Sequence, residues 1–340
     1  MCHYRILLLL TQAPQVMCGK PIMENITWQI VGSSVQGTSH IRQGLPNQDA
    51  LHYSEQQAPL VLAVADGHGS AKCFRSQQGA QFAVQCAVSI MQERVSSRLS
   101  VQDLRWLAEE NLSKTLVQSW RSAVTADVQT NPFTDAERPL LPTNQEPYLA
   151  YGSTLLVAVI TTSALLLMQL GDGDILVVSA DGHVQRPIAA DPQLIGNETT
   201  SLCGKDAWQQ FRTAVWPLTH QPALIVLASD GYANSFKNEA SFLRVGSDLL
   251  AMIQQAGLAA VAASLPSWLQ EASAMGSGDD VTVGLMYAQA KPPSRYVVAS
   301  KRPMAKRASL ATQREALKHK RTRCNDGEVC QSFSGVSHRD

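Results

Sequence analysis

The stretch APLVLAVADGHGS, residues 58–70, decides much of the fold that the sequence predicts. Residues 58–66 form a short, continuous apolar run, which is typical of a buried strand. The run ends at Asp66-Gly67-His68-Gly69. Residues 71–95 then place apolar side chains at spacings of three and four, with Ser70 in position to cap a helix. The sequence therefore predicts a strand, a short connection that contains Asp-Gly, and a helix, in that order.

A second Asp-Gly-His triplet, at residues 181–183, stands in a different context. It lies between two strand-like runs, residues 174–180 and 183–188. Asp-Gly between two short strands is the signature of a tight hairpin turn. We therefore expect the second triplet to be a turn with His183 facing solvent, and we look for chemistry at the first.

The composition is that of a globular chain with a sizeable core. It has 340 residues, of which 45% are hydrophobic and 16% charged, so neither disulfides nor structural zinc are needed for stability. The 7 cysteines are scattered without a CxxC pair, which favours a reducing compartment, and we expect a cytoplasmic protein. Cys73, Cys86 and Cys203 are expected to be core thiols. No apolar run approaches the roughly 20 residues that span a bilayer.

The two ends of the chain differ from the rest. Met23 offers an internal start, so we interpret residues 1–22 as an N-terminal extension that is not native. Residues 291–340 hold 12 Lys and Arg against 4 Asp and Glu, a net charge of +8, whereas residues 1–290 hold 16 against 24, a net of −8. This basic tail lacks apolar periodicity and is predicted to be disordered. We interpret the tail as a solvated appendage, the alternative being that it docks on an acidic partner, nucleic acid or a membrane surface. Nucleic acid is not expected to bind any other part of the chain.

The remaining elements come in blocks rather than in alternation. Helices are predicted over 101–125, 238–256 and 258–273, and loops over 40–49 and 127–148. In the first of these helices, every fourth position is apolar: Leu104, Ala108, Leu112, Leu116 and Trp120. Further strands are predicted over 27–35, 153–160, 164–170, 223–229 and 281–287. This order favours mainly antiparallel sheets covered by helices over a doubly wound parallel sheet.

Aspartates stand where apolar strands meet loops. Each one alone is usually a turn residue, but several buried carboxylates together repel one another unless a cation lies among them. Oxygen-only clusters suit Mg²⁺ or Mn²⁺, and two bridged ions generate hydroxide and clamp a phosphate. The sequence therefore predicts a divalent metal site formed by Asp49, Asp66, Asp172, Asp230 and Asp279.

Six motifs in order carry a family resemblance: NQDA (47–50), VADGHGS (64–70), YGSTLLVAVI (151–160), LGDGD (170–174), LASDGY (227–232) and GDDVTV (278–283). Over residues 28–288 the chain resembles the metal-dependent protein serine/threonine phosphatases, the PPM or type 2C family, and most of all their bacterial branch. The resemblance implies an α+β fold, a four-layer α-ββ-α sandwich with two central, mainly antiparallel sheets. It also implies that residues 23–290 form the phosphatase domain.

The resemblance implies a role for each carboxylate. Asp66 would bridge two Mg²⁺ or Mn²⁺ ions, and the Gly67 carbonyl would bind one of them. Asp230 and Asp279 would ligate the first ion, and Asp49 would hold metal-bound waters near the second. A third, weaker ion would involve Asp172. Asp280 would support the ligand Asp279 without binding an ion itself.

The catalytic step that the resemblance implies uses a metal-bridging hydroxide as nucleophile, so no phosphoenzyme is expected. His68 would protonate the leaving serine or threonine oxygen, a role that an imidazole with a pKa near neutrality can fill. The expected substrate is a phosphorylated protein, and a serine/threonine kinase is an expected partner. We expect a monomer.

Two positions depart from the family pattern. Gln48 stands where the family commonly has a metal-ligating Glu, and a neutral amide is a weaker ligand for a hard ion. Gly44 stands where the phosphate-binding Arg is usual; His40 and Arg42 lie nearby, and Arg42 is favoured for its bidentate geometry. These departures keep two alternatives open: a catalytically weak regulatory member that binds phosphoprotein, and a hydrolase of small-molecule phosphate esters.

Overall fold

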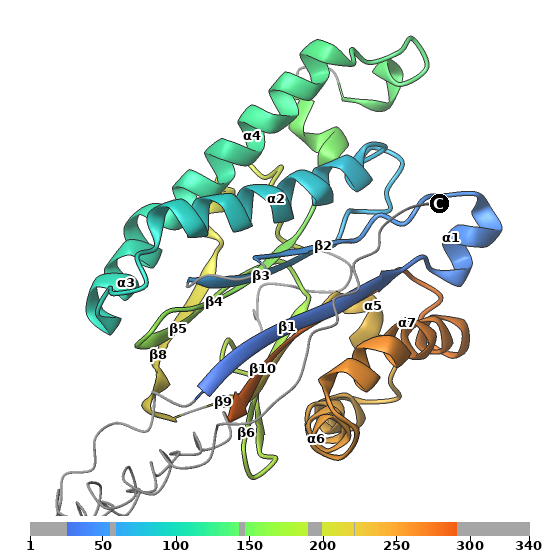
Figure 1. Ribbon diagram of the computed structural model, residues 1–340. Coiled ribbons are helices and arrows are strands. Elements are labelled where there is room, and N and C mark those ends of the chain that lie inside the picture. Colours follow the sequence, from blue (N-terminus) through green and yellow to red (C-terminus); the bar gives the residue numbers. More distant parts are fainter. Residues whose placement is uncertain (1–25, 55–58, 143–146, 190–198, 221, 291–340) are drawn as a thin grey trace, which may run out of the picture. The chain divides into compact units, whose positions relative to one another are not determined.

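The computed structural model describes residues 26–54, 59–142, 147–189, 199–220 and 222–290 (Figure 1). All of them belong to one compact unit, Met1–Pro292. The predicted extension at 1–22 and the predicted tail at 291–340 lie outside the described residues. Within the described ranges, no helix is long and apolar enough to cross a membrane.

Two five-stranded sheets form the centre of this unit, and every pair of neighbouring strands is antiparallel. The first sheet has the order β1 (Ile26–Val35), β10 (Val281–Ala290), β9 (Pro222–Ala228), β6 (Asp174–Ser179) and β7 (Val184–Gln185). The second has the order β2 (Ala50–Tyr53), β3 (Leu60–Ala65), β4 (Leu155–Ile160), β5 (Ala164–Leu170) and β8 (Arg212–Pro217).

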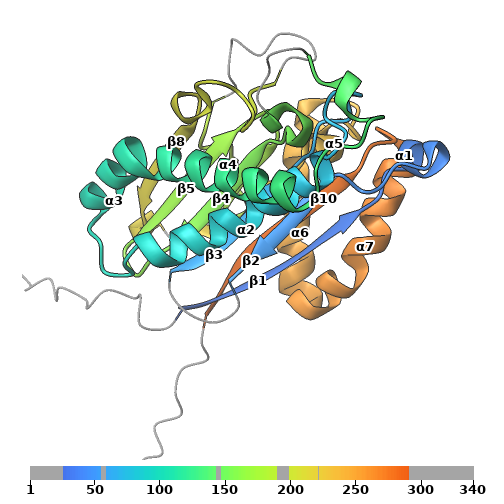
Figure 2. The ribbon, with the colours of Figure 1, turned by 90° about the horizontal axis from the view of Figure 1, so that it is seen from above.

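Helices cover the outer face of each sheet (Figures 1 and 2). The second sheet is covered by α2 (Ser76–Arg94), α3 (Val101–Leu107), the π-helical turn η2 (Ala108–Leu112) and α4 (Ser113–Thr130). The first is covered by α6 (Glu239–Ala256) and α7 (Leu258–Met275). Short helices complete the unit: α1 (Thr38–Gln43), α5 (Asp230–Ala233), η3 (Arg138–Leu140), η4 (Pro147–Tyr151), η5 (Ala207–Gln209) and η6 (Leu218–His220). The predicted α-ββ-α sandwich is confirmed.

The strands explain why their sequences are continuously apolar. In β3, Val61 and Ala63 belong to the core beneath the helices, whereas Leu62 and Val64 belong to the core between the two sheets. Successive side chains of a strand point to opposite faces, and both faces of this strand are covered. A continuous run of apolar residues is the pattern that burial on both faces requires.

Several boundaries differ from the predictions. The predicted loop 40–49 contains α1, which begins after Gly37 and ends at Gly44 in the left-handed conformation, φ 68°. The helix predicted over 71–95 begins at Ser76 with Arg75 as its N-cap, so the Ser70 cap was wrong. The helix predicted over 101–125 continues to Thr130 through the π turn, and the loop after it starts correspondingly later.

The apolar row of that long helical segment is confirmed, because each of its five members is at most 1% exposed. The turn at 181–183 is confirmed as well. Gly182 has φ 86° and joins β6 to the two-residue β7, and His183 is exposed. The second Asp-Gly-His triplet is therefore a hairpin turn.

Candidate active site

Five carboxylates lie at the same end of the sandwich because the strands around them are antiparallel. Asp66 follows β3, and Asp49 precedes β2, whose Ala50 pairs with Ala65. Asp172 lies in the turn between β5 and β6, Asp230 opens α5 directly after β9, and Asp279 lies just before β10. The end of β9 lies beside the starts of β6 and β10, because Ala228 pairs with Asp174 and with Val283.

The carboxylates form one electrostatic group. Burial raises the pKa of Asp66 well above its usual range, and the charges of Asp49 and Asp230 raise it further. Burial likewise raises the pKa of Asp230, whose carboxyl lies within hydrogen-bonding reach of Asp66. Burial raises the pKa of Asp49 to about 7, although Ser229 Oγ donates a 2.7 Å hydrogen bond to its Oδ2. These shifts disfavour the ionised carboxylates, and a positive charge among them would favour ionisation.

The residues fit divalent cations. In the described ranges, no Lys or Arg forms an ion pair with Asp49, Asp66, Asp230 or Asp279. The side-chain oxygen of Gln48 is buried without a hydrogen-bond partner in the same part of the structure. An oxygen-rich cluster with an unsatisfied acceptor is a donor set that Mg²⁺ or Mn²⁺ and its water ligands would satisfy.

Gly67 is enclosed by backbone. A Cβ at this position would lie 2.7 Å from the carbonyl oxygens of both Gln48 and Ser76. Its N–H donates to the Gln48 carbonyl at 3.1 Å, and it forms an isolated bridge with Ser153. Close packing therefore requires glycine here, whether or not its carbonyl binds a metal.

His68 stands beside the carboxylates and is held by one glycine. Its backbone N–H donates to the Gly152 carbonyl at 3.0 Å, and a Cβ on Gly152 would lie 2.7 Å from the imidazole Cδ2. Burial lowers the pKa of His68, while the charge of Asp172 raises it. The ring is thus placed against Gly152 and within the electrostatic influence of Asp172.

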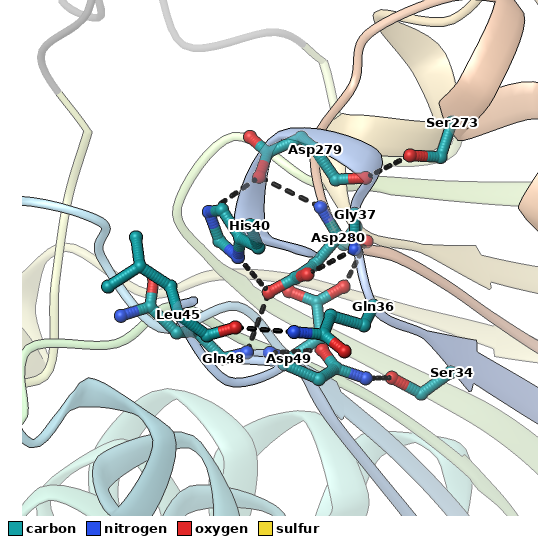
Figure 3. A network of polar contacts seen from close by, with 12 residues as sticks. Ser34, Gln36, Gly37, His40, Leu45, Gln48, Asp49, Ser273, Asp279 and Asp280 are labelled. Carbon is teal, nitrogen blue, oxygen red and sulfur yellow. Dashed lines mark hydrogen bonds and ion pairs between the residues drawn. The ribbon is translucent and has the colours of Figure 1, made fainter. Parts of the chain in front are cut away.

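His40 and Arg42, the two candidates for phosphate binding, lie in different surroundings. His40 Nδ1 is 2.8 Å from Asp280 Oδ2, and its Nε2 is 3.5 Å from Asp279 Oδ1 (Figure 3). Arg42 is exposed on the last turn of α1. The structure therefore brings His40 to the carboxylates, and it shows no ion pair of Arg42 with any described residue.

Sequence reasoning missed the hydroxyl residues that orient these carboxylates. Ser229 Oγ bonds Asp49 and also accepts the N–H of Thr282 at 2.9 Å. Thr154 Oγ1 accepts the N–H of Asp66 at 3.0 Å. The sequence signals available for these contacts were Ser229, directly before Asp230, and Thr282 in the motif DVTV. Neither is recognisable from the sequence alone as a partner of an aspartate.

Comparisons with known proteins agree with this geometry. The protein phosphatase 2C family model matches residues 36–270. Serine/threonine-protein phosphatase 3 of Escherichia coli strain K12 is 28% identical over 194 residues, which are 55% of this chain and 68% of that protein.

Two solved structures share the fold at low sequence identity. A bacterial serine phosphatase has a TM-score of 0.52 at 15% identity and covers 78% of this chain and all of its own. The catalytic domain of the serine/threonine protein phosphatase PstP, solved with two manganese ions, has a TM-score of 0.50 at 18% identity and covers 77% of this chain and 99% of its own. Since the family model spans more than half of its residues, the chain belongs to the protein phosphatase 2C family of metal-dependent protein phosphatases.

Proposed function

We propose that this chain hydrolyses phosphoserine and phosphothreonine in proteins, with its cations held at the shared end of the two sheets. The observation that carries the proposal is the group formed by the buried Asp49 and the half-buried Asp66 and Asp230, whose pKa values are raised by desolvation and by neighbouring carboxylates. The serine/threonine phosphatases that it resembles support the substrate class. The same comparisons favour this activity over a catalytically weak regulatory member that binds phosphoprotein, and over a hydrolase of small-molecule phosphate esters.

In this proposal, the carboxylates divide the cations between them. Asp66 would be shared by two ions, Asp230 and Asp279 would hold the first, and Asp49 would hold waters near the second. The Gly67 carbonyl would bind one of the two. Asp172, which is exposed, is the place for a weaker third ion. Bound divalent cations supply an activated water at neutral pH and neutralise charge on the phosphate.

His68 is proposed to donate the proton that the leaving serine or threonine oxygen needs. Its ring is partly buried, held through Gly152 and close to Asp172. Burial disfavours the imidazolium and Asp172 favours it, so the two effects oppose each other. A ring nitrogen with a pKa near neutrality both holds and releases a proton at working pH.

Gln48 contributes through its backbone as well as its side chain. Its N–H donates to Asp280 Oδ2 at 2.6 Å, and its carbonyl accepts from Gly67 N–H. The side-chain oxygen is buried and has no hydrogen-bond partner among the described residues. We propose that this amide oxygen accepts a hydrogen bond from a water of the second ion, in place of direct ligation by a carboxylate.

The test compares two substrates with and without Mn²⁺. Phosphate release from a phosphothreonine peptide and from p-nitrophenyl phosphate is measured for the wild type and for Asp66→Asn. We expect Mn²⁺-dependent release from the peptide and none from the variant, with unchanged circular dichroism. Full activity of Asp66→Asn would contradict the metal assignment, and turnover of the small ester alone would contradict the substrate class.

We further propose that a serine/threonine kinase is the partner of this phosphatase, that it is a cytoplasmic monomer, and that residues 23–290 carry the activity. The scattered cysteines support a reducing compartment, and the strand-end aspartates, all of which lie within residues 23–290, support that part as the one that carries the activity. Size-exclusion chromatography with light scattering tests the oligomeric state. Dephosphorylation of kinases encoded near this gene tests the partner.

A further inference from the structure

Asp280 is a buried carboxylate whose oxygens are both engaged (Figure 3). It is 3% exposed. The N–H of Gly37 donates to its Oδ1 at 2.6 Å, the N–H of Gln48 donates to its Oδ2 at 2.6 Å, and His40 Nδ1 lies 2.8 Å from the same Oδ2. Short N–H donors on a carboxylate are strong, charge-assisted hydrogen bonds.

The two N–H donors belong to one segment, residues 37–48, as does His40, whose Nδ1 lies at ion-pair distance from the carboxylate without forming a hydrogen bond among the described residues. The carboxylate belongs to another segment, the residues that lead into β10. The first segment ends directly before Asp49, and the second contains Asp279 next to Asp280. The Asp280 carboxylate therefore fastens together the two pieces of chain that carry these two proposed ligands. No other described hydrogen bond joins a side chain of residues 278–280 to the segment 37–48.

The Asp279 side chain is oriented by the same arrangement. The N–H of Asp280 donates to Asp279 Oδ1 at 2.8 Å, and His40 Nε2 lies 3.5 Å from that oxygen. Ser273 Oγ fixes the backbone by donating to the Asp279 carbonyl at 2.8 Å. The Asp279 side chain is 52% exposed. Its Oδ1 is therefore oriented by protein contacts while the carboxylate remains accessible from solvent.

His40, Asp279 and Asp280 together have the composition of a cation site, since their ligand atoms lie within 4.8 Å of one another. The backbone donors argue against that use. Both oxygens of Asp280 already accept N–H groups, and a metal ion would have to compete with them. His40 fits better as the side chain that lies between the two carboxylates and keeps residues 37–48 next to Asp280.

We propose that His40 is a positioning residue of the metal site, which acts through Asp280 to hold the segment before Asp49 against the segment that carries Asp279. This inference rests on the proposed function, because it takes Asp49 and Asp279 as residues of that site. It assigns to His40 a role different from phosphate contact, since both ring nitrogens face carboxylates. Partners that orient metal ligands typically change metal affinity by about 10- to 100-fold when they are removed.

The test uses two isosteric replacements that separate the two contacts of His40. In His40→Asn the amide nitrogen occupies the place of Nδ1 and keeps a donor for Asp280. In His40→Gln the amide nitrogen extends towards the place of Nε2 and keeps a donor for Asp279. His40→Ala removes both, and His183→Ala, at the exposed hairpin turn, is the matched control.

Mn²⁺ affinity of the metal-free full chain is measured by isothermal titration calorimetry, and kcat and KM are measured at saturating Mn²⁺. We expect Mn²⁺ affinity to fall about 10- to 100-fold in His40→Ala, to recover in His40→Asn and to stay low in His40→Gln. The KM for the phosphopeptide is expected to stay at the wild-type value in all three. Circular dichroism identifies any variant that fails to fold. If His40→Ala fails to fold, the difference in Mn²⁺ affinity between His40→Asn and His40→Gln tests the inference.

Three results would overturn the inference: wild-type Mn²⁺ affinity in His40→Ala, recovery in His40→Gln but not in His40→Asn, or a raised KM with unchanged Mn²⁺ affinity. The last of these would restore His40 as a phosphate contact. Asp279→Asn is measured in parallel. If that variant binds Mn²⁺ as tightly as the wild type, the proposed metal site is refuted, whatever the His40 variants do.

Discussion

Replacing Gly152 by alanine tests the proposed acid without touching any metal ligand. The added Cβ would lie 2.7 Å from Cδ2 of His68, 3.1 Å from the Cys73 sulfur and 3.3 Å from the Cys203 sulfur. Carbon atoms in contact prefer about 3.5–4.0 Å, so the imidazole has to retreat by about 1 Å. Gly152 has no positive φ, so the backbone itself tolerates alanine.

A shift of that size has a large expected effect on a proton transfer. Misplacement of a catalytic group by about 1 Å costs on the order of 100-fold in rate, which is about 2.7 kcal/mol in the barrier. We therefore expect kcat for a phosphothreonine peptide to fall about 100-fold in Gly152→Ala. The carboxylates are not displaced, so Mn²⁺ affinity measured by calorimetry is expected to stay unchanged.

The choice of substrate isolates the proton transfer. The p-nitrophenolate anion leaves without protonation, whereas the alkoxide of threonine does not, so the loss on p-nitrophenyl phosphate is expected to be much smaller. Gly69→Ala is the matched control, because its Cβ would meet only Gln48 Oε1, at 3.6 Å. Equal losses on the two substrates, or a full rate on the peptide, would refute the assignment of His68 as the acid.

Four further outcomes are expected. Asp66→Asn should lose Mn²⁺ binding in calorimetry while its circular dichroism stays that of the wild type; retained affinity contradicts the bridging role. In EDTA, thermal stability should fall as pH rises from about 4 to about 7, because the raised pKa of Asp49 and its neighbours makes the native state hold protons that the unfolded state releases. A flat melting temperature over that range counts against the carboxylate cluster. In Gly79→Ala the added Cβ would lie 1.8 Å from a carbonyl oxygen of η4, so the free energy of unfolding measured in urea should fall by about 3 kcal/mol or more. The control Gln78→Ala, at the exposed neighbouring position, should leave it almost unchanged. A chain that ends at Ala290 should keep its rate on the phosphopeptide, and a loss of turnover would give the residues beyond it a part in catalysis.

The strands predicted from a continuous apolar run are buried on both faces, and β1 and β10 were predicted correctly as well. β3, β4, β5, β6 and β9 are continuous apolar runs, and such runs are recognised without knowledge of their partners. β2 and β8 were missed because they lack this signal. β2 has four residues, ALHY, with His52 exposed, and β8 is half-buried along most of its length. Their strand conformation depends on pairing with β3 and β5, which the local sequence does not encode.

The candidate site was predicted in part for a similar reason. Each strand-end aspartate is visible locally, and the antiparallel order of the strands brings all of them to one end. The contacts that position them are long-range: Gly37 and Asp280 are 243 residues apart, and Gln48 and Asp280 are 232 apart. No spacing rule connects such positions. His40 was therefore noted as a nearby basic residue, and its contact with Asp280 appears only in the folded chain.

Asp279 and Asp280 show how one fold gives adjacent, identical residues opposite tasks. Successive residues of an extended segment point in opposite directions, so Asp280 faces the interior at 3% exposure and Asp279 faces outward at 52%. The inward carboxylate has two backbone N–H donors and His40, which is the condition under which a buried charge is tolerated. The outward one accepts the N–H of Asp280 on one oxygen only and keeps capacity for a cation. Asp280 stabilises the local fold through its hydrogen bonds. Asp279 belongs to the carboxylate cluster, in which repulsion between like charges destabilises the fold. It follows that the doublet cannot be exchanged residue for residue: an amide at 279 removes charge from the cation site, whereas an amide at 280 sets its own NH₂ against a backbone donor and loosens the segment that holds the site together.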